Sequence, residues 1–352
     1  MLAQPAALPD LAGTTSAPLP PARGRCSARL LAYLQGYRSV ALLDPVAPTV
    51  WDDEDAQLAL HLCYELHYRG LDGVDPELEW DPAVIALRRR LERRLIAELH
   101  DEVAGWSEMP PADRPMDVDE VKAAMLSLAT TPRGPSLSSH MATDGTIEQI
   151  REFAIHRSAY QLKEADPHTW GIPRLTGRAK AAMVLIQADE YGEGRPGHMH
   201  CELFADTMRA LGLDDTYGAY VDDLPASTLA TTNLVSAFGL NRRWRGALVG
   251  HLALFEMTSV GPMGRYAASL RRLGVPEAAP FYDVHVLADE HHQQVALDDL
   301  VDGFVRSEPE LAADVVFGAA ALTAVEGRLT ERLLDAWAHG RSSLRRTGPR
   351  WS

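Results

Sequence analysis

Apolar residues recur along most of this chain at the three- and four-residue spacing of amphipathic helices. Period-two runs of β-branched and aromatic residues, which would indicate strands, are nearly absent. Breakers rich in Gly and Pro, such as Gly192–Gly197 and Gly261–Gly264, separate the periodic stretches. The pattern predicts an all-α fold with helices over Ala56–Arg69, Pro82–Glu102, Val118–Leu128, Thr146–Lys163, Gly177–Glu190, His200–Leu211, Ser227–Phe238, Arg242–Met257, Ala279–Val305 and Pro309–Ala338.

The predicted helices fall into two groups of different composition. Residues 26–140 are rich in Arg, Leu and Glu, whereas residues 141–340 carry the helices that bear His and acids. Because no long linker separates the groups, we expect residues 26–140 to form a helical extension that packs on a bundle formed by residues 141–340. Residues 1–25, rich in Pro, Ala, Ser and Thr, are expected to be a disordered leader. Residues 341–352 are expected to be a disordered tail.

Composition and charge argue against several classes of function. A net charge of −15 argues against binding to nucleic acid or an anionic membrane, and no window holds the ~18 consecutive apolar residues of a membrane span. Three scattered cysteines argue against a disulfide scaffold and a Cys-based metal site. The chain begins without the features of a secretory signal, so we expect a cytoplasmic location. Thirteen histidines are the first indication of chemistry.

The sharpest local feature is the segment from His285 to His292. On a helix that turns 100° per residue, His285, Asp289 and His292 fall within about 60° of one another. Two imidazoles and a carboxylate on one face form a common ligand set for divalent iron. The alternative is that these residues form a solvent-exposed face of the helix. The spacing supports a metal site and an exposed face about equally.

A second group of ligand-type residues surrounds a stretch rich in Gly and Pro. On one regular helix, Glu190 and His200 would lie about 15 Å apart, too far for a shared pair of metals. The glycines and Pro196 between them should interrupt the helix. The interruption can bring the two side chains toward one site. A surface loop with solvated acids is the alternative, and the residues alone favour it.

Two isolated acids complete the candidates. Glu256 stands in a strongly apolar helical stretch, where a buried carboxylate needs a partner or becomes neutral. A metal is one such partner, whereas His251 falls on a different face of the helix. Glu164 closely precedes a predicted helix stop at Asp166–Pro167. For Glu256, an exposed position on the helix surface is about as well supported as a role in a metal site. For Glu164, an exposed position is the better supported of the two.

Taken together, these residues resemble the haem-oxygenase-like diiron oxidases and oxygenases, often labelled iron-containing redox enzymes. His285, Asp289 and His292 match the family's helix motif H-x3-D-x2-H. Glu190 and His200 match the E-x9-H pair of its N-oxygenating members. The resemblance covers about residues 145–340 and does not extend to the first 140.

The other two acids also match positions of this family. Glu256 corresponds to the acid on the intervening helix, and Glu164 to the additional carboxylate of N-oxygenating members. The resemblance therefore implies a haem-oxygenase-like helical bundle that binds two Fe²⁺ ions per chain and uses O2 as co-substrate. Glu164, Glu190 and Glu256 would be the catalytic carboxylates. The implied metal ligands are Glu164, Glu190, His200, Glu256, His285, Asp289 and His292.

The implied function is that of an oxidoreductase acting on a small molecule. Glu164 favours N-oxygenation of an amine or amino acid. Oxidative C–C cleavage or desaturation of an amino acid or fatty acid on the same site is the alternative, and a haem-binding or non-catalytic helical protein is a further one. An external electron donor would supply the electrons that the substrate does not, and a homodimer is left open.

Several further residues are candidates for lining the pocket. We expect Cys201 to face away from the metals, because a thiolate there would be open to oxidation. Aromatic candidates are Tyr160, Trp170, Tyr191, Phe255 and Tyr282. Candidates for binding a substrate carboxylate are Arg174, Arg178, Arg195, Arg242, Arg243 and Arg245.

Overall fold

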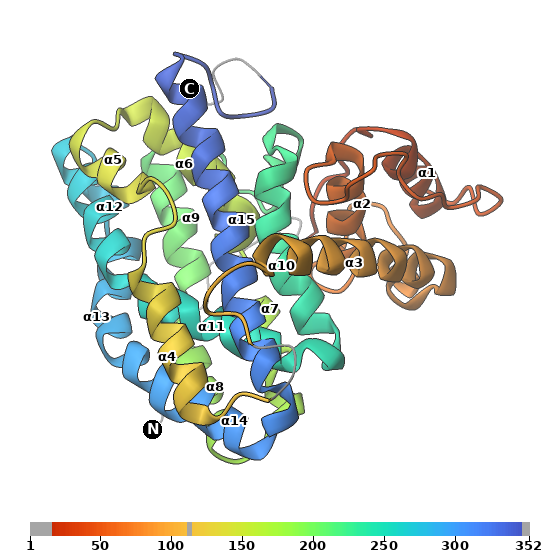
Figure 1. The fold of residues 1–352 in the computed structure, drawn as a ribbon. Helices are drawn as coiled ribbons and strands as arrows, with labels where there is room; N and C mark the ends of the chain where they lie inside the picture. Colours follow the sequence, from red (N-terminus) through yellow and green to blue (C-terminus); the bar gives the residue numbers. More distant parts are fainter. Residues whose placement is uncertain (1–15, 111–114, 347–352) are drawn as a thin grey trace, which may run out of the picture.

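The computed structural model of the protein describes residues 16–110 and 115–346 (Figure 1). Within these ranges the chain forms helices and no strand, apart from an isolated bridge between Ala17 and Leu71. The predicted all-α fold is therefore confirmed. The α-helices are α1 (Arg25–Leu34), α2 (Glu54–Glu65), α3 (Pro82–Val103), α4 (Val118–Thr130), α5 (Leu137–Thr143), α6 (Ile147–Gln161), α7 (Asp166–Thr169), α8 (Gly177–Glu190), α9 (His200–Ala210), α10 (Ala226–Leu240), α11 (Arg245–Thr258), α12 (Val260–Arg272), α13 (Pro280–Gln294), α14 (Asp302–Ser307) and α15 (Ala312–Ala338).

Short helical segments connect several of these helices. One of them, η7, is a π-helix that continues α13 without a break, and the others are single 3₁₀ turns. They are η1 (Pro76–Trp80), η2 (Ile172–Arg174), η3 (Gly192–Gly194), η4 (Val221–Asp223), η5 (Arg242–Trp244), η6 (Pro276–Ala278), η7 (Val295–Val301) and η8 (Pro309–Leu311).

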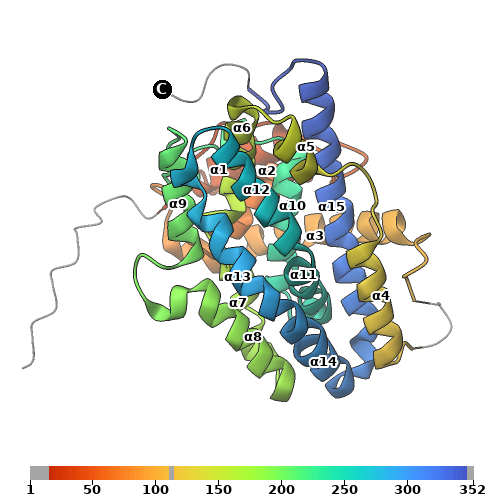
Figure 2. The same ribbon diagram turned by 90° about the vertical axis from the view of Figure 1, so that its left-hand side faces the viewer.

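The long helix α15 runs the length of the bundle and packs against α11, α10, α4 and α3 (Figures 1 and 2). Helices α1, α2 and α3 form a layer at one side, where α2 packs on α10 and α3 on α15. Helices α4 and α5, although N-terminal to residue 141, pack within the bundle on α15 and α12. The candidate ligands come from α8, α9, α11, α13 and the turn after α6.

Two glycines allow α11 and α15 to approach closely. A Cβ on Gly250 would collide with the backbone of Val315, and one on Gly318 would collide with the backbone of Ala247. Because packed interiors leave no room for such atoms, any side chain at either position would push the helices apart. The glycines therefore set the position of α11, the helix that carries Glu256.

Two predicted boundaries were wrong. Gly261–Gly264 is no breaker, because it forms the first turn of α12, where Pro262 is tolerated since its missing N–H would have no partner there. The stretch Ala279–Val305 is not one α-helix, because the π-helix η7 separates α13 from α14. π-helical segments are rare and short, and the apolar pattern of this stretch indicated a helix without distinguishing its type.

The end of the predicted leader is packed against the rest of the chain. Ala17 is buried, and its backbone exchanges hydrogen bonds with Gly70 and Asp72. Ala17 is therefore held by backbone pairing, in contrast to the disorder expected for residues 1–25 from their composition. The remainder of the predicted leader, residues 1–15, lies outside the described residues.

The beginning of the predicted tail is also packed. Ser343 is buried, and its hydroxyl donates a hydrogen bond to Glu152 at 2.6 Å. Leu344 is buried beside it. Residues 341–346 are thus held against the bundle, again in contrast to the expectation, and residues 347–352 lie outside the described residues.

A buried ion pair joins the layer of α1, α2 and α3 to the segment that precedes Glu164. The ammonium group of Lys163 contacts the Glu65 carboxylate, and each side chain is only 1% exposed. The hydroxyl of Tyr217 also donates to Glu65. Arg69 donates to the carbonyl oxygen of Leu162 at 2.9 Å. Two residues of the N-terminal layer therefore hold the backbone just ahead of a candidate ligand.

We predict that Glu65→Ala lowers the free energy of unfolding by about 3–5 kcal/mol, because it leaves the Lys163 ammonium buried without its counter-charge. Chemical denaturation measures the change. Asp52→Ala is the control, since Asp52 pairs with Arg328 at the surface, and it should cost less than about 1 kcal/mol. Equal effects of the two substitutions would contradict the importance assigned to the buried pair.

Candidate metal centre

The broken helix between α8 and α9 brings Glu190 and His200 together. Glu190 ends α8 and His200 begins α9, and the chain between them turns through Gly192 and Glu193, whose φ angles are +59° and +54°. The Nδ1 atom of His200 lies 2.9 Å from a carboxylate oxygen of Glu190. Both side chains are buried, so the alternative of a solvated loop does not hold for them. The exposed residues of this stretch include Glu193 and His198.

Glu190 belongs to a first group of four buried side chains. Ligand atoms of Glu164, Glu190, His200 and His285 all lie within 4.8 Å of one another. The Nδ1–H of His285 donates to the carbonyl oxygen of Phe281 at 2.7 Å. This bond orients the imidazole so that its Nε2 faces Glu164, at 3.7 Å. One carboxylate oxygen of Glu164 is buried and has no hydrogen-bond partner among the described residues.

A second group shares Glu190 with the first. Ligand atoms of Glu190, Glu256 and His292 also lie within 4.8 Å of one another. The Nδ1 atom of His292 is 3.2 Å from Glu256 and 3.5 Å from Asp289, which is buried beside it. The structure therefore brings six of the seven candidate ligands into two groups that share the Glu190 carboxylate. The seventh, Asp289, lies beside His292 of the second group.

Burial and mutual repulsion perturb the carboxylates. Burial raises the pKa of Glu256 to about 8, and the charges of Asp289 and Glu190 act in the same direction. Burial alone would also raise the pKa of Glu190, yet the charge and hydrogen bond of His200 lower it to about 2. Burial raises the pKa of Glu164 as well. Crowded acids of this kind need positive charge nearby to stay ionised.

The neighbouring carboxylates raise the pKa values of two histidines. Burial would lower the pKa of His285, but the Glu164 carboxylate raises it to about 10. Burial would likewise lower the pKa of His292, but hydrogen bonds to Asp289 and Glu256 raise it to about 11. Protons on these rings supply positive charge that a divalent cation would also supply. Nitrogen and oxygen donors with an unpartnered carboxylate oxygen fit an iron ion, whose ligands are commonly His and carboxylate.

Asp189 is a functional candidate that the sequence reasoning did not select. Its carboxylate lies 2.8 Å from Nε2 of His292, while Nδ1 of the same ring faces Glu256 and Asp289. The imidazole can therefore present Nδ1 to a metal and donate Nε2–H to Asp189, a common arrangement around metal-bound histidines. The adjacency of Asp189 to Glu190 was the only signal in the sequence.

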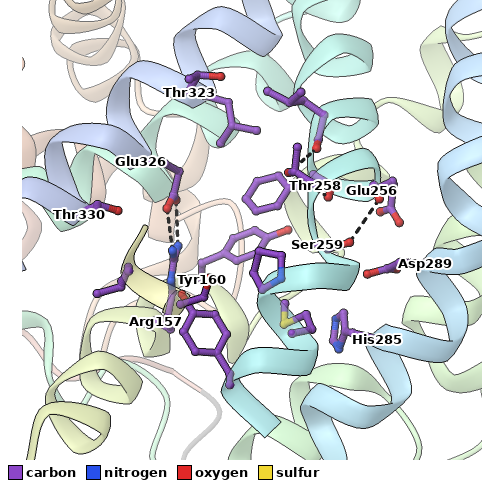
Figure 3. A pocket seen from close by; sticks show the side chains of 18 of the residues that line it. Arg157, Tyr160, Glu256, Thr258, Ser259, His285, Asp289, Thr323, Glu326 and Thr330 are labelled. Atoms are coloured by element: carbon purple, nitrogen blue, oxygen red, sulfur yellow. Dashed lines mark hydrogen bonds and ion pairs between the residues drawn. The ribbon is translucent and has the colours of Figure 1, made fainter. Parts of the chain in front are cut away.

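A cavity of about 420 Å³ opens beside the two groups and is lined by Glu164, Glu190, Glu256, His285 and Asp289. Figure 3 shows part of this wall, with Glu256, Asp289 and His285 along one side. A cavity of this size suits a small molecule.

The aromatic candidates divide into two sets. Tyr160, Phe255 and Tyr282 line the cavity, as expected. Tyr191 and Trp170 are not among its lining residues, and the Tyr191 hydroxyl instead donates to Asp166 at 2.8 Å.

The candidate arginines do not line this cavity within the described chain. Arg245, for example, pairs with Glu308 outside it. Arg157, which the sequence reasoning overlooked, lies in the cavity wall. Cys201 belongs to neither group of ligand atoms among the described residues, and burial raises the pKa of its thiol to about 11.

An all-α, haem-oxygenase-like fold around a buried cluster of His and carboxylates is the setting of an iron-dependent oxidoreductase. The family of iron-containing redox enzymes matches residues 151–327, and the chain belongs to this family. The matched range includes all seven candidate ligands. No helix in the described ranges is long and apolar enough to cross a membrane.

The chain is also similar to a nitrosourea synthase from Streptomyces achromogenes subsp. streptozoticus. The two are 23% identical over 245 residues, which is 68% of this chain and 51% of that protein. The chain therefore spans about half the length of this curated relative.

The raised pKa values predict how the metal-free protein responds to pH. His285 and His292 bind protons more tightly in the folded state, so their contribution to stability is complete below about pH 6.5. That contribution is lost as the pH rises through the folded-state values of about 10 and 11. In the presence of a chelator, the melting temperature of the wild-type protein should fall as the pH is raised from 7 to 10. The fall should be smaller in His285→Gln. The exposed neighbour His291→Gln is the control; equal slopes in both variants would contradict the assignment.

Proposed function

We propose that this protein is a non-haem diiron enzyme that uses O2 to N-oxygenate an amine of a small molecule. The observation that carries the proposal is the Glu190 carboxylate, which is common to two adjacent groups of buried ligand atoms. One carboxylate between two ligand sets is suited to bridge two metals about 3.5–4 Å apart. Two Fe²⁺ ions held there would bind and activate O2.

The seven side chains would divide between the two ions. Glu164, His200 and His285 would bind one ion, and Glu190 would bridge to the other. The remaining three ligands would be Glu256, Asp289 and His292. Four carboxylates would offset the four positive charges of two ferrous ions, which removes the repulsion among the acids.

The proposed reaction balances with an external donor of two electrons. The primary amine R–NH2 reacts with O2, two electrons and two protons to give the hydroxylamine R–NHOH and water. In a desaturation, two C–H bonds of the substrate would supply two electrons, the external donor would supply two more, and O2 would become two molecules of water. The product therefore distinguishes these reactions. The nitrogen must approach unprotonated, and buried carboxylates beside the cavity can accept its proton.

Two observations support nitrogen as the atom oxidised. The Glu164 carboxylate lies in the first group, within 4.8 Å of the other ligand atoms, and the resemblance associates a carboxylate at this place with N-oxygenation. The curated relative is named for making a nitrosourea, a compound with oxidised nitrogen. Oxidative cleavage of C–C bonds lacks a comparable observation.

Anaerobic titration with Fe²⁺ tests the metal assignment. We expect two ions per chain in the wild-type protein and a loss of at least one in His292→Ala, because a ligand is removed. His291→Ala is a matched control, since His291 is the exposed neighbour on the same helix. Asp289→Ala and its exposed neighbour Glu290→Ala form a second matched pair. Equal iron content in both members of each pair would contradict the site.

Replacing Asp189 tests its proposed hydrogen bond to His292. We expect Asp189→Asn to weaken Fe²⁺ binding about 10- to 100-fold at one of the two sites, because the ring loses the carboxylate that orients it. Competition with a chelating dye measures the affinity. Glu193→Gln, in the exposed loop after α8, should leave it unchanged. Loss of affinity at both sites, or at neither, would contradict this assignment.

Exposing the iron-loaded protein to O2 tests the reaction. With a two-electron donor and an amine substrate, we expect one hydroxylamine for each O2 consumed, measured by an oxygen electrode and mass spectrometry. Iron-loaded protein that never consumes O2, or that releases only cleaved or desaturated carbon products, would refute N-oxygenation.

A further inference from the structure

We propose that Arg157 and Glu326 form the recognition site for a substrate that carries both a carboxylate and a cationic nitrogen, as an amino acid does. The inference deepens the proposed function, on which it rests, by giving the class of small molecule that enters the cavity. Both side chains line the cavity that also borders the candidate metal ligands.

Arg157 and Glu326 face each other across two helices. Arg157 lies on α6 and Glu326 on α15, and the guanidinium donates two hydrogen bonds to the two carboxylate oxygens, at 2.8 and 2.6 Å. Figure 3 shows the pair on one side of the cavity and Glu256, Asp289 and His285 on the other. A molecule that reached both sides would present one end to the ion pair and another part to the metals.

The pair keeps binding capacity for a ligand. The side chains of Arg157 and Glu326 are 17% and 23% exposed, so each has surface open to the cavity. The Nε–H of Arg157 has no hydrogen-bond partner among the described residues, and each Glu326 oxygen accepts only one bond from Arg157. The hydroxyl of Tyr266, which also lines the cavity, has no hydrogen-bond partner within the described chain. A paired Arg and Glu therefore still offer a donor and acceptors.

The chemistry of the pair defines the ligand. A guanidinium matches a carboxylate through parallel N–H bonds, and a carboxylate matches an ammonium or guanidinium group. A ligand with only a fatty chain would use neither the remaining donor of Arg157 nor the remaining acceptors of Glu326. The apolar side chains of Leu252, Phe255 and Met263 line the same cavity. They suit the carbon chain of a small zwitterion, and the cavity volume of about 420 Å³ suits its size.

Equilibrium binding tests the proposal independently of turnover. The probes are the twenty standard L-amino acids, measured by calorimetry against the iron-free protein and against the anaerobic Fe²⁺-loaded protein. For the tightest binder, two truncated analogues are added: the amine that lacks the carboxylate, and the acid that lacks the α-amino group. Octanoate serves as the apolar acid.

We expect at least one amino acid to bind with a Kd below about 10 mM, and each truncation to weaken binding about 10- to 100-fold. The double variant Arg157→Met, Glu326→Met should bind the amino acid and its truncated forms about equally. Replacing both partners avoids an unpaired buried charge. The single variant Arg157→Lys keeps a positive charge, so it should retain part of the preference for ligands that carry the carboxylate.

A second ion pair provides the control. Arg245 and Glu308 are linked by hydrogen bonds and are similarly buried, with side chains 11% and 22% exposed, but neither lines the cavity. Arg245→Met, Glu308→Met should therefore bind as the wild-type protein does. No binding by any amino acid, tighter binding of octanoate, or an unchanged preference in the Arg157/Glu326 double variant would overturn the proposal. Failure of O2 consumption alone would refute the proposed reaction and leave these binding results intact.

Discussion

Four carboxylates and three imidazoles lie buried side by side in this bundle, and the free energy needed to remove them from water is the constraint around which the site is organised. A buried charge is stable only with a counter-charge or hydrogen bonds. The chain meets this requirement partly through its own residues, since His200 stabilises the Glu190 carboxylate and Glu164 stabilises protonated His285. Glu256, whose pKa rises to about 8, shows where these interactions fall short. Two divalent cations would supply the missing charge.

The helices outside the ligand set contribute by fixing backbone positions. Glycines at the contact of α11 and α15 allow close packing that places Glu256. On the opposite flank, Glu65 and Arg69 bind the segment just before Glu164. Ala165, which follows Glu164, has a φ of +75°, a conformation that costs free energy and must be held by its surroundings. The N-terminal layer is therefore coupled to the position of one candidate ligand, a role that its own sequence does not display.

Local spacing explains which features could be predicted from the sequence. The helical pattern and the shared face of His285, Asp289 and His292 depend on residues within two turns, so periodicity reveals them. Glu190 and His200 needed the family resemblance, because spacing alone could not show how the loop bends. Asp189 and Arg157 escaped attention because their partners lie 103 and 169 residues away. Pairings at that distance depend on how whole helices pack, which no local pattern encodes.

The central claim is that one carboxylate, Glu190, lies between two iron ions. The most direct test is a crystal structure of the anaerobic Fe²⁺-loaded protein with anomalous scattering recorded at the iron absorption edge. The account predicts two anomalous peaks about 3.5–4 Å apart, one beside His200 and His285 and one beside Glu256 and His292, with Glu190 contacting both. A single peak, or iron bound away from Glu190, would contradict it.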